Sequence, residues 1–276
     1  MIRFAVTALA CLAASAARAA CDAEGHCAIP LGTYHVAVPD GADDVPLVLW
    51  LHGAGGSGAG ALRNTAGVRR YLDRGYAFAA ADGLARPGGD GTRTGWSFHP
   101  DRPAQRDEAA FLAAVADDIA AQFPVDRDRV ILAGFSIGGS LTTYVACAHP
   151  DLFDAYAPVA GSFWRPHPTE CSGPVDLFHT HGWADRTVPL EGRPLGGGAI
   201  EQGDVWYAMM LWRETLGCAG LQPDETSRTD LYWRRDWTTC AGGSLAFALH
   251  PGGHGIPEGW SGMMLDWYEA LPRGTE

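Results

Sequence analysis

Short apolar runs alternate with helix-type patterns along most of the chain. Between the apolar runs, apolar positions recur at helical spacing over residues 106–123, in the stretch from residue 140 to residue 148, and near residues 205–216. Six apolar runs are typical of strands: residues 33–38, 46–51, 76–81, 130–134, 174–180 and 245–249. This alternation predicts an α/β fold with a mostly parallel central sheet and helices on both of its faces.

Length and composition agree with a single folded domain. The chain has 276 residues, of which 47% are hydrophobic and 19% charged, which excludes a disordered or coiled-coil protein. No internal repeat or linker divides it. We therefore expect one domain over residues 20–276, with the glycine-rich stretch 192–203 as its most mobile loop.

The first nineteen residues have the pattern of a signal peptide. A cationic start at Met1–Arg3 is followed by an apolar run at Phe4–Ala14 and by the small-x-small sequence Ala17-Arg18-Ala19. The run is too short to anchor a protein in a bilayer. We expect residues 1–19 to be removed and the mature protein to be secreted or periplasmic, without a membrane anchor. The alternative is a buried N-terminal helix.

The charge argues against polyanionic partners. All 20 basic residues are arginine, and 32 acidic residues bring the formal charge to −12. Because affinity for nucleic acid comes largely from cationic contacts, we expect no nucleic-acid partner.

The cysteines fit an oxidising compartment. Cys11 lies in the predicted leader, and the six remaining cysteines are an even number. Six cysteines allow fifteen pairings, and zinc is a rival use, although no C-x-x-C pair supports a metal site. The nearest-neighbour hypothesis pairs Cys21 with Cys27, Cys147 with Cys171, and Cys218 with Cys240.

A G-x-S-x-G sequence carries the first candidate for chemistry. Ser136 lies at its centre, directly after the strand 130–134 and before the helix that ends at Ala148. A strand-to-helix turn of this kind exposes a serine hydroxyl above the sheet. The hydroxyl needs a base and a carboxylate to become a nucleophile.

Two loops downstream supply a base and an acid in the order Ser, Asp, His. His254 follows the strand 245–249 in a glycine-rich loop, with His250 as the second choice. Asp185 follows the strand 174–180 and would orient the imidazole, unless it is a turn residue paired with Arg186.

An oxyanion hole is predicted from two backbone amides. The loop after the strand 46–51 begins Leu51-His52-Gly53-Ala54, and the N–H of Ala54 is one expected donor. The second donor is the N–H of Ile137, the residue after Ser136. His52 itself is expected to be structural. These elements together predict the α/β-hydrolase fold.

The chain resembles secreted α/β-hydrolase esterases of the polyhydroxybutyrate depolymerase and LpqC-type feruloyl esterase group. The resemblance runs from about Pro46 to Trp260 and rests on these segments: Leu51-His52-Gly53, Phe123-Pro124-Val125-Asp126, Gly134-Phe135-Ser136, residues 153–161, His181-Gly182 with Asp185, Val188-Pro189, and Gly252-Gly253-His254. It implies ester hydrolysis without a metal or cofactor, matches Ser136, Asp185 and His254 to the group's triad, and supports the Cys218–Cys240 pair.

The resemblance implies a secreted serine esterase that works through an acyl-enzyme. The resemblance leaves two substrate classes as alternatives: polyhydroxyalkanoate oligomers, and feruloyl or acetyl esters of polysaccharides. We therefore expect an ester substrate that can be polymeric. Trp96, Trp164 and Trp183 lie in predicted loops and are candidates for a substrate groove.

Alternative interpretations remain for some of these residues and for the function. The tandem His179-Thr180-His181 is compatible with a metal site, but no further set of ligands completes such a site. The rival functions are a peptidase or lipase of the same fold and a catalytically inactive binding protein.

Overall fold

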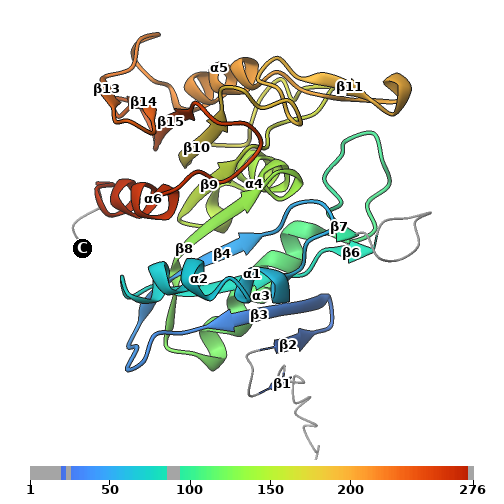
Figure 1. Cartoon of the computed structure of the whole chain (residues 1–276), viewed down its shortest axis with the longest axis vertical. Helices are drawn as coiled ribbons and strands as arrows, with labels where there is room; N and C mark the ends of the chain where they lie inside the picture. The colour runs from blue at the N-terminus through green and yellow to red at the C-terminus, as the bar shows by residue number, and fades with distance from the viewer. Residues whose placement is uncertain (1–19, 23–25, 86–93, 273–276) are drawn as a thin grey trace, which may run out of the picture.

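An eleven-stranded sheet forms the centre of the molecule (Figure 1). The computed structural model describes residues 20–22, 26–85 and 94–272, so the predicted leader at residues 1–19 lies outside the described residues. The strand order within the sheet is β1-β2-β3-β5-β4-β8-β9-β10-β15-β14-β13. The strands of this sheet are β1 (Ala20–Cys21), β2 (His26–Ile29), β3 (Gly32–Ala37), β4 (Val45–Leu51), β5 (Ala77–Ala81), β8 (Val125–Phe135), β9 (Ala155–Val159), β10 (Asp176–Gly182), β13 (Glu225–Arg228), β14 (Trp233–Trp237) and β15 (Ser244–His250).

The middle of the sheet is parallel and its margins are antiparallel. Strands β5, β4, β8, β9, β10 and β15 run in the same direction. Strands β1 to β3 at one margin, and β14 and β13 at the other, pair antiparallel. Two small ribbons lie outside the sheet, one of β6 (Leu84–Ala85) with β7 (Thr94–Gly95) and one of β11 (Arg193–Leu195) with β12 (Ile200–Gln202).

Alternating side chains of the strands build a core on each face of the sheet. On β4, Leu47, Leu49 and Leu51 belong to one buried cluster, whereas Val48 and Trp50 belong to the other. The first cluster packs against α3 (Glu108–Gln122), α4 (Ile137–Ala148) and α5 (Val205–Leu216). The second packs against α1 (Gly58–Leu62), α2 (Thr65–Leu72) and α6 (Trp260–Glu269). Helices therefore cover both faces, as the α/β-hydrolase fold requires (Figure 1).

Aspartates cap two of the helices that cover the first face. The side chain of Asp107 accepts a hydrogen bond from the amide of Ala110 at the start of α3. The side chain of Asp204 accepts from the amides of Trp206 and Tyr207 at the start of α5. These bonds satisfy amides that have no partner within a helix. At the start of α4, Ser136 makes no such bond, which leaves its hydroxyl for other contacts.

Three disulfides join cysteines that are neighbours in the sequence. They are Cys21–Cys27, Cys147–Cys171 and Cys218–Cys240, the pairs that the nearest-neighbour hypothesis proposed. Disulfides of this number are typical of proteins from oxidising compartments.

Several elements differ from the pattern-based prediction. Strand β9, the hairpin of β13 and β14, and helices α1, α2 and α6 were not predicted. The run predicted as a strand at 130–134 is longer, because β8 begins at Val125. Within the stretch 192–203, the glycine run at 196–198 forms a short 3-10 turn between β11 and β12, which was not predicted. Among the described residues, no helix combines the length and the apolar character needed to cross a membrane.

A buried ion pair fixes the loop that leads into α3. Arg106 Nη2 lies 2.8 Å from Glu108 Oε2, and both side chains are almost completely buried. Arg106 also donates to the carbonyl oxygens of Leu31 and Asp82, at 3.1 Å each, and its guanidinium stacks 3.6 Å from the ring of Phe111. The pair therefore joins three separate segments of the chain.

Replacing Arg106 by alanine is expected to lower the free energy of unfolding by about 3–5 kcal/mol, because Glu108 would be left buried without a counter-charge. Urea unfolding followed by tryptophan fluorescence measures this. Arg165→Ala is the matched control, since Arg165 pairs with Glu201 at the surface, and such a pair contributes about 0–1 kcal/mol. Equal losses in the two variants would contradict the account.

Candidate active site

Ser136 occupies a strained turn between β8 and α4. Its backbone has φ 58° and ψ −121°, a conformation that non-glycine residues rarely adopt. The turn is tight because glycines surround it. A Cβ atom on Gly138 would lie 2.3 Å from the carbonyl oxygen of Leu51, and one on Gly161 would lie 2.2 Å from that of Ser136. Close backbone contact thus holds the serine at the carboxyl end of β8.

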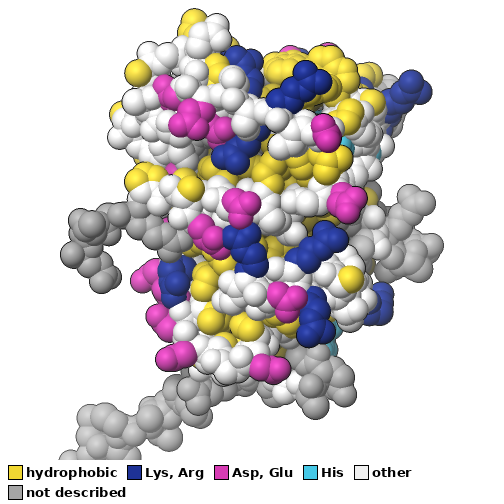
Figure 2. Space-filling view, turned by 60° about the vertical axis from the view of Figure 1, so that its left-hand side comes forward, with side chains coloured by type: hydrophobic (Ala, Val, Ile, Leu, Met, Phe, Trp, Pro, Cys, Tyr) yellow, Lys and Arg dark blue, Asp and Glu magenta, His cyan; other side chains and the backbone are white. Residues whose placement is uncertain are grey.

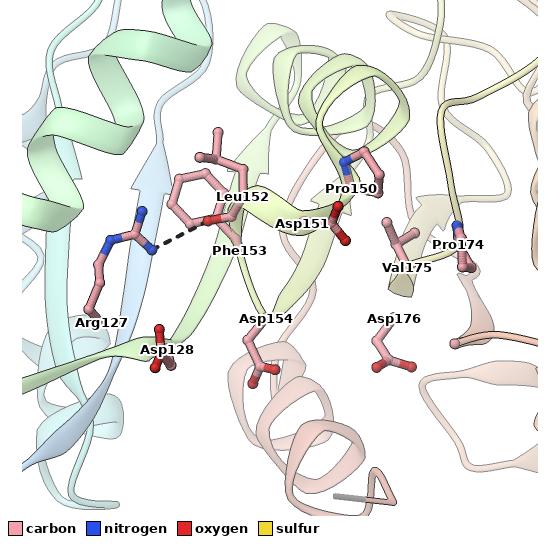
Figure 3. Close-up of a pocket in the computed structure, with 11 residues that line it drawn as sticks. Arg127, Asp128, Pro150, Asp151, Leu152, Phe153, Asp154, Pro174, Val175 and Asp176 are labelled. Atoms are coloured by element: carbon pink, nitrogen blue, oxygen red, sulfur yellow. Dashed lines mark hydrogen bonds between the residues drawn. The ribbon is translucent and has the colours of Figure 1, made fainter. Parts of the chain in front are cut away.

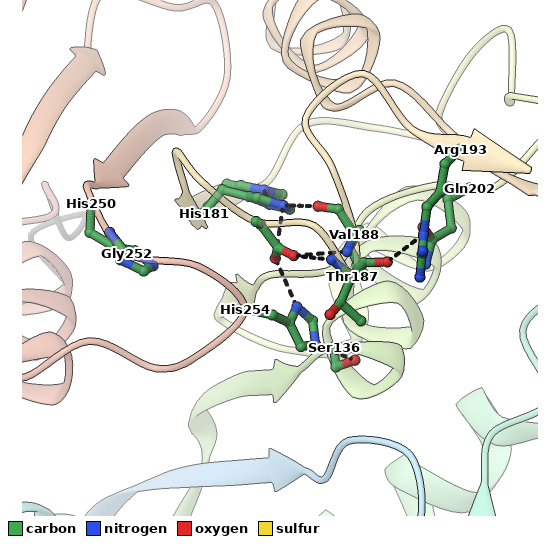
Figure 4. A network of polar contacts seen from close by, with 11 residues as sticks. Ser136, His181, Thr187, Val188, Arg193, Gln202, His250, Gly252 and His254 are labelled. Carbon is green, nitrogen blue, oxygen red and sulfur yellow. Dashed lines mark hydrogen bonds and ion pairs between the residues drawn. The ribbon is translucent and has the colours of Figure 1, made fainter.

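The structure brings the three predicted triad side chains into one hydrogen-bonded row. His254 Nε2 lies 3.0 Å from Ser136 Oγ, and His254 Nδ1 lies 2.7 Å from Asp185 Oδ2. Figure 4 shows the imidazole of His254 between Ser136 and the carboxylate. The three residues follow the carboxyl ends of β8, β10 and β15, which are parallel members of one sheet. Ligands commonly bind at this edge of an open α/β sheet.

Asp185 is held as a carboxylate. Its Oδ1 accepts hydrogen bonds from the amides of Thr187 and Val188, at 2.8 and 2.9 Å. Burial alone would raise the pKa of Asp185, but the bonds from His254, Val188 and Thr187 outweigh it, so the pKa lies below the usual aspartate value. The ionised group can therefore orient His254 and stabilise its protonated form.

A pair of buried histidines supports the loop of Asp185. His181 Nε2 lies 2.8 Å from the carbonyl oxygen of Val188 and 3.6 Å from Asp185 Oδ2. His179 Nε2 lies 3.2 Å from His181 Nδ1. Burial lowers the pKa of both histidines, and His179 is affected most. Because both rings are neutral, each carries one N–H group. His179 Nε2 therefore donates to His181 Nδ1, and His181 Nε2 donates to the carbonyl oxygen of Val188.

These contacts explain the tandem histidines without a metal. Sequence reasoning did not assign them a structural role, nor did it find the amides that bind Asp185. For these amides, the signal in the sequence was the position of Val188-Pro189, which begins three residues after Asp185. Within the described residues, no group of histidine, cysteine and acidic side chains could hold a metal ion.

The two backbone amides predicted as oxyanion donors, those of Ala54 and Ile137, make no hydrogen bond with another described residue. A Cβ atom on Gly53 would lie 3.4 Å from Ser136 Cβ, so the loop after β4 passes directly by the serine. His52 fixes this loop: its Nδ1 donates to the carbonyl of Gly53 at 2.8 Å, and its Nε2 accepts from the amide of Gly83 at 3.0 Å. His52 is thus structural, as predicted.

The three candidate tryptophans occupy different environments. Trp96 is nearly buried, and its indole N–H donates to the carbonyl of His52 at 2.9 Å. Trp164 is nearly buried as well, and its indole N–H donates to Ser140 Oγ at 3.2 Å. Both therefore stabilise the loops around the site rather than form an open groove. Trp183 is exposed at the carboxyl end of β10.

His250, the second choice for the base, lies outside the row of the triad. Its Nδ1 accepts from the amide of Gly252 at 3.2 Å, and burial lowers its pKa. Figure 4 shows it away from Ser136, on the other side of His254.

A separate pocket opens at the opposite edge of the sheet. It has a volume of about 380 Å³ and lies at the amino ends of β9, β10 and β15 (Figure 3). Its side chains include Arg127 and the carboxylates of Asp128, Asp151, Asp154 and Asp176, but no serine, cysteine or histidine. It therefore contains no nucleophile and base of the kind present at Ser136.

Comparisons with known proteins agree with the fold. Residues 64–165 match the prolyl oligopeptidase family. A protein named esterase NocK, from Nocardia uniformis subsp. tsuyamanensis, is 36% identical over 163 residues, covering 56% of this chain and 44% of that protein. This chain thus spans less than half the length of that relative. In solved structures, acetyl xylan esterase from Aspergillus awamori superposes with a TM-score of 0.63 at 15% identity, covering 86% of this chain and 93% of that one.

Two further relatives belong to the group that the motifs resemble. A feruloyl esterase C from Aspergillus terreus is 23% identical over 241 residues, covering 82% of this chain and 77% of that protein. Poly(3-hydroxyalkanoate) depolymerase C from Paucimonas lemoignei is 30% identical over 137 residues, covering 46% and 31%. The resemblance to α/β-hydrolase esterases is confirmed by these relatives.

Proposed function

We propose that this chain, which has the α/β-hydrolase fold and esterases among its relatives, is a serine esterase that hydrolyses carboxylic esters. The observation that carries the proposal is the row of hydrogen bonds from Ser136 through His254 to Asp185, at 3.0 and 2.7 Å. Separations of this size allow a proton to pass from the hydroxyl to the imidazole.

Each residue has a defined part in the reaction. Ser136 Oγ attacks the ester carbonyl carbon while His254 Nε2 takes its proton. The N–H groups of Ala54 and Ile137 donate to the oxyanion that forms. His254 then gives the proton to the departing alcohol, and an acyl-enzyme remains on Ser136. Water, deprotonated by His254, then attacks the acyl carbon. The bond from that carbon to Ser136 Oγ breaks, His254 returns the proton to Oγ, and the acid is released. Asp185 stays ionised throughout and stabilises the protonated imidazole.

The names of the relatives support two substrate classes as candidates. Polyhydroxyalkanoate oligomers and feruloyl or acetyl esters of polysaccharides are the candidates, and the exposed Trp183 supports a site for a large substrate.

We further propose that the protein is exported after loss of residues 1–19. Its three disulfides support this, because such bonds persist mainly in oxidising compartments.

A parallel assay of substrate classes tests the proposal. The purified chain would be incubated with 4-nitrophenyl acetate, hydroxybutyrate oligomers, a feruloylated arabinoxylan and acetylated xylan. We expect hydrolysis of the chromogenic ester and of at least one natural class. A short proline-containing peptide is included because residues 64–165 match the prolyl oligopeptidase family. Cleavage of the peptide without hydrolysis of any ester would favour a peptidase, and no turnover at all would favour an inactive binding protein.

A further inference from the structure

A pocket of about 440 Å³ lies directly beside the loop of His254. Leu231, from the turn between β13 and β14, forms one wall, and residues 250–257 form the other. None of the residues that line it carries a carboxylate or a guanidinium group. The pocket therefore fits an uncharged group.

Hydrogen bonds fix the two walls relative to each other. The hydroxyl of Tyr232 donates to the carbonyl of Glu258 at 2.8 Å, which joins the turn of the hairpin to the segment after His254. At the other side, the amide of Ala184 donates to the carbonyl of Gly252 at 3.0 Å. Both the hairpin and the loop of His254 are thus anchored, so the pocket is part of the fold.

Exposed apolar side chains lie on the segments next to the pocket. The amide of Trp183 donates to the carbonyl of His250 at 2.7 Å, and Trp233 follows Leu231 by two residues. The exposed fractions are 45% for Leu231, 47% for Ile256, 57% for Trp183 and 38% for Trp233. The rings of Trp183 and Trp233 are in contact, with centroids 6.2 Å apart. Figure 2 shows hydrophobic side chains exposed in the upper half of the molecule, the half that holds β13, β14 and β15 in Figure 1. Apolar patches of this kind commonly mark binding surfaces.

The order of the strands places this pocket on one side of Ser136. The loop of Ala54 follows β4, which neighbours β8 on one side, whereas β10, β15, β14 and β13 lie on the other. The carbonyl oxygen of a bound ester would point to the amides of Ala54 and Ile137. The alcohol oxygen would then point to His254 Nε2, which must protonate it as the bond between carbonyl carbon and alcohol oxygen breaks. The alcohol therefore leaves toward β15 and the pocket.

We infer that the pocket beside His254, together with Trp183 and Trp233, binds the alcohol portion of the ester, and that this portion is uncharged and presents an apolar face, as a sugar ring or a hydroxyalkanoate chain does. The inference rests on the proposed esterase function. It assigns specificity for the alcohol to the β13–β14 hairpin, which sits at the margin of the sheet and contributes nothing to the triad.

Matched esters test the inference. Two butyrate esters share one acyl group and differ in the alcohol, which is methanol in one and 2-(2-naphthyl)ethanol in the other. Methyl 2-naphthylacetate carries the bulky group on the acyl side. Leu231→Ser and Trp233→Ser are each expected to lower kcat/KM for the naphthylethyl ester about tenfold, since each loses apolar contact with the alcohol. The two methyl esters should change less than twofold. Leu221→Ser is the control, because Leu221 is also exposed but lies in the segment before β13, away from His254.

The outcomes separate the two claims. Equal losses for all three esters, a loss confined to methyl 2-naphthylacetate, or no loss for any ester would overturn the alcohol-side pocket and leave the esterase proposal standing. Failure of the unaltered protein to hydrolyse any of the three esters would overturn both.

Discussion

Replacing Ser136 by alanine is expected to reduce ester hydrolysis by about four to six orders of magnitude, the range seen when the nucleophile of a serine hydrolase is removed. The hydroxyl is the only group removed, and the N-terminal turn of α4 keeps its backbone hydrogen bonds. The free amides of Ala54 and Ile137 would remain, so the residual rate should still exceed the rate in water. The measurement is kcat/KM for 4-nitrophenyl acetate.

The control for this variant is Ser244→Ala. Ser244 is also buried, but it lies at the amino end of β15, where its hydroxyl donates to Asp176 at 2.7 Å. Ser244→Ala should hydrolyse the ester at the unaltered rate. Retention of turnover by Ser136→Ala would end the proposed mechanism, provided that circular dichroism shows both variants folded.

Replacing Asp185 by asparagine is expected to lower kcat about 10⁴-fold while leaving the fold intact. The geometry explains the size of the loss. The amides of Thr187 and Val188 donate to one oxygen of Asp185, so the oxygen of an asparagine would remain there. Its NH₂ group would then face His254 and donate to Nδ1. The proton of the neutral imidazole would be forced onto Nε2, which could no longer accept the proton of Ser136.

The matched control is Asp176→Asn, because Asp176 lies at the amino end of β10 whereas Asp185 follows its carboxyl end. The hydroxyl of Ser244 donates to Asp176 Oδ1 at 2.7 Å, and the amide oxygen of an asparagine can accept the same hydrogen bond. Activity equal to that of the unaltered protein is expected for Asp176→Asn. A loss in Asp185→Asn no greater than tenfold would contradict the orienting role.

The pH dependence of stability tests the lowered pKa of Asp185. Because its pKa in the folded protein is lowered below 3.8, the carboxylate stabilises the fold above the unfolded pKa, and this contribution is lost as the pH falls through the lowered value. The free energy of unfolding of the unaltered protein should therefore decrease over that acidic range by more than that of Asp185→Asn.

The parallel centre of the sheet could be predicted from the sequence, because its strands are buried on both faces. Strand β4, Val-Pro-Leu-Val-Leu-Trp-Leu, is an apolar run that only a covered strand explains. Strand β13, Glu-Thr-Ser-Arg, is fully exposed and carries no such signal, so the hairpin that lines the pocket beside His254 was missed. Helix α6 was missed as well, although its buried face includes Trp260, Met264 and Trp267.

The residues of the site also fall into those that could be placed from the sequence and those that could not. Ser136, Asp185 and His254 could be placed at one edge because each follows a parallel strand, and the structure brings them together. The support from His181 could not be predicted, because the contact between its Nε2 and the carbonyl of Val188 depends on how the loop after β10 folds back. Trp96 and Trp164 were candidates for a substrate groove because they lie in predicted loops, yet their side chains are nearly buried and their indole N–H groups donate to His52 and Ser140.

Reaction with a fluorophosphonate tests the central claim most directly. The Oγ of an activated serine attacks the phosphorus atom and fluoride leaves, so the product is a stable adduct on that serine alone. Mass spectrometry of the folded protein should show one adduct per chain, on the peptide that contains Ser136, and prior replacement of His254 should prevent it. An unlabelled protein, or an adduct on any other serine, would contradict a nucleophile activated at the turn between β8 and α4.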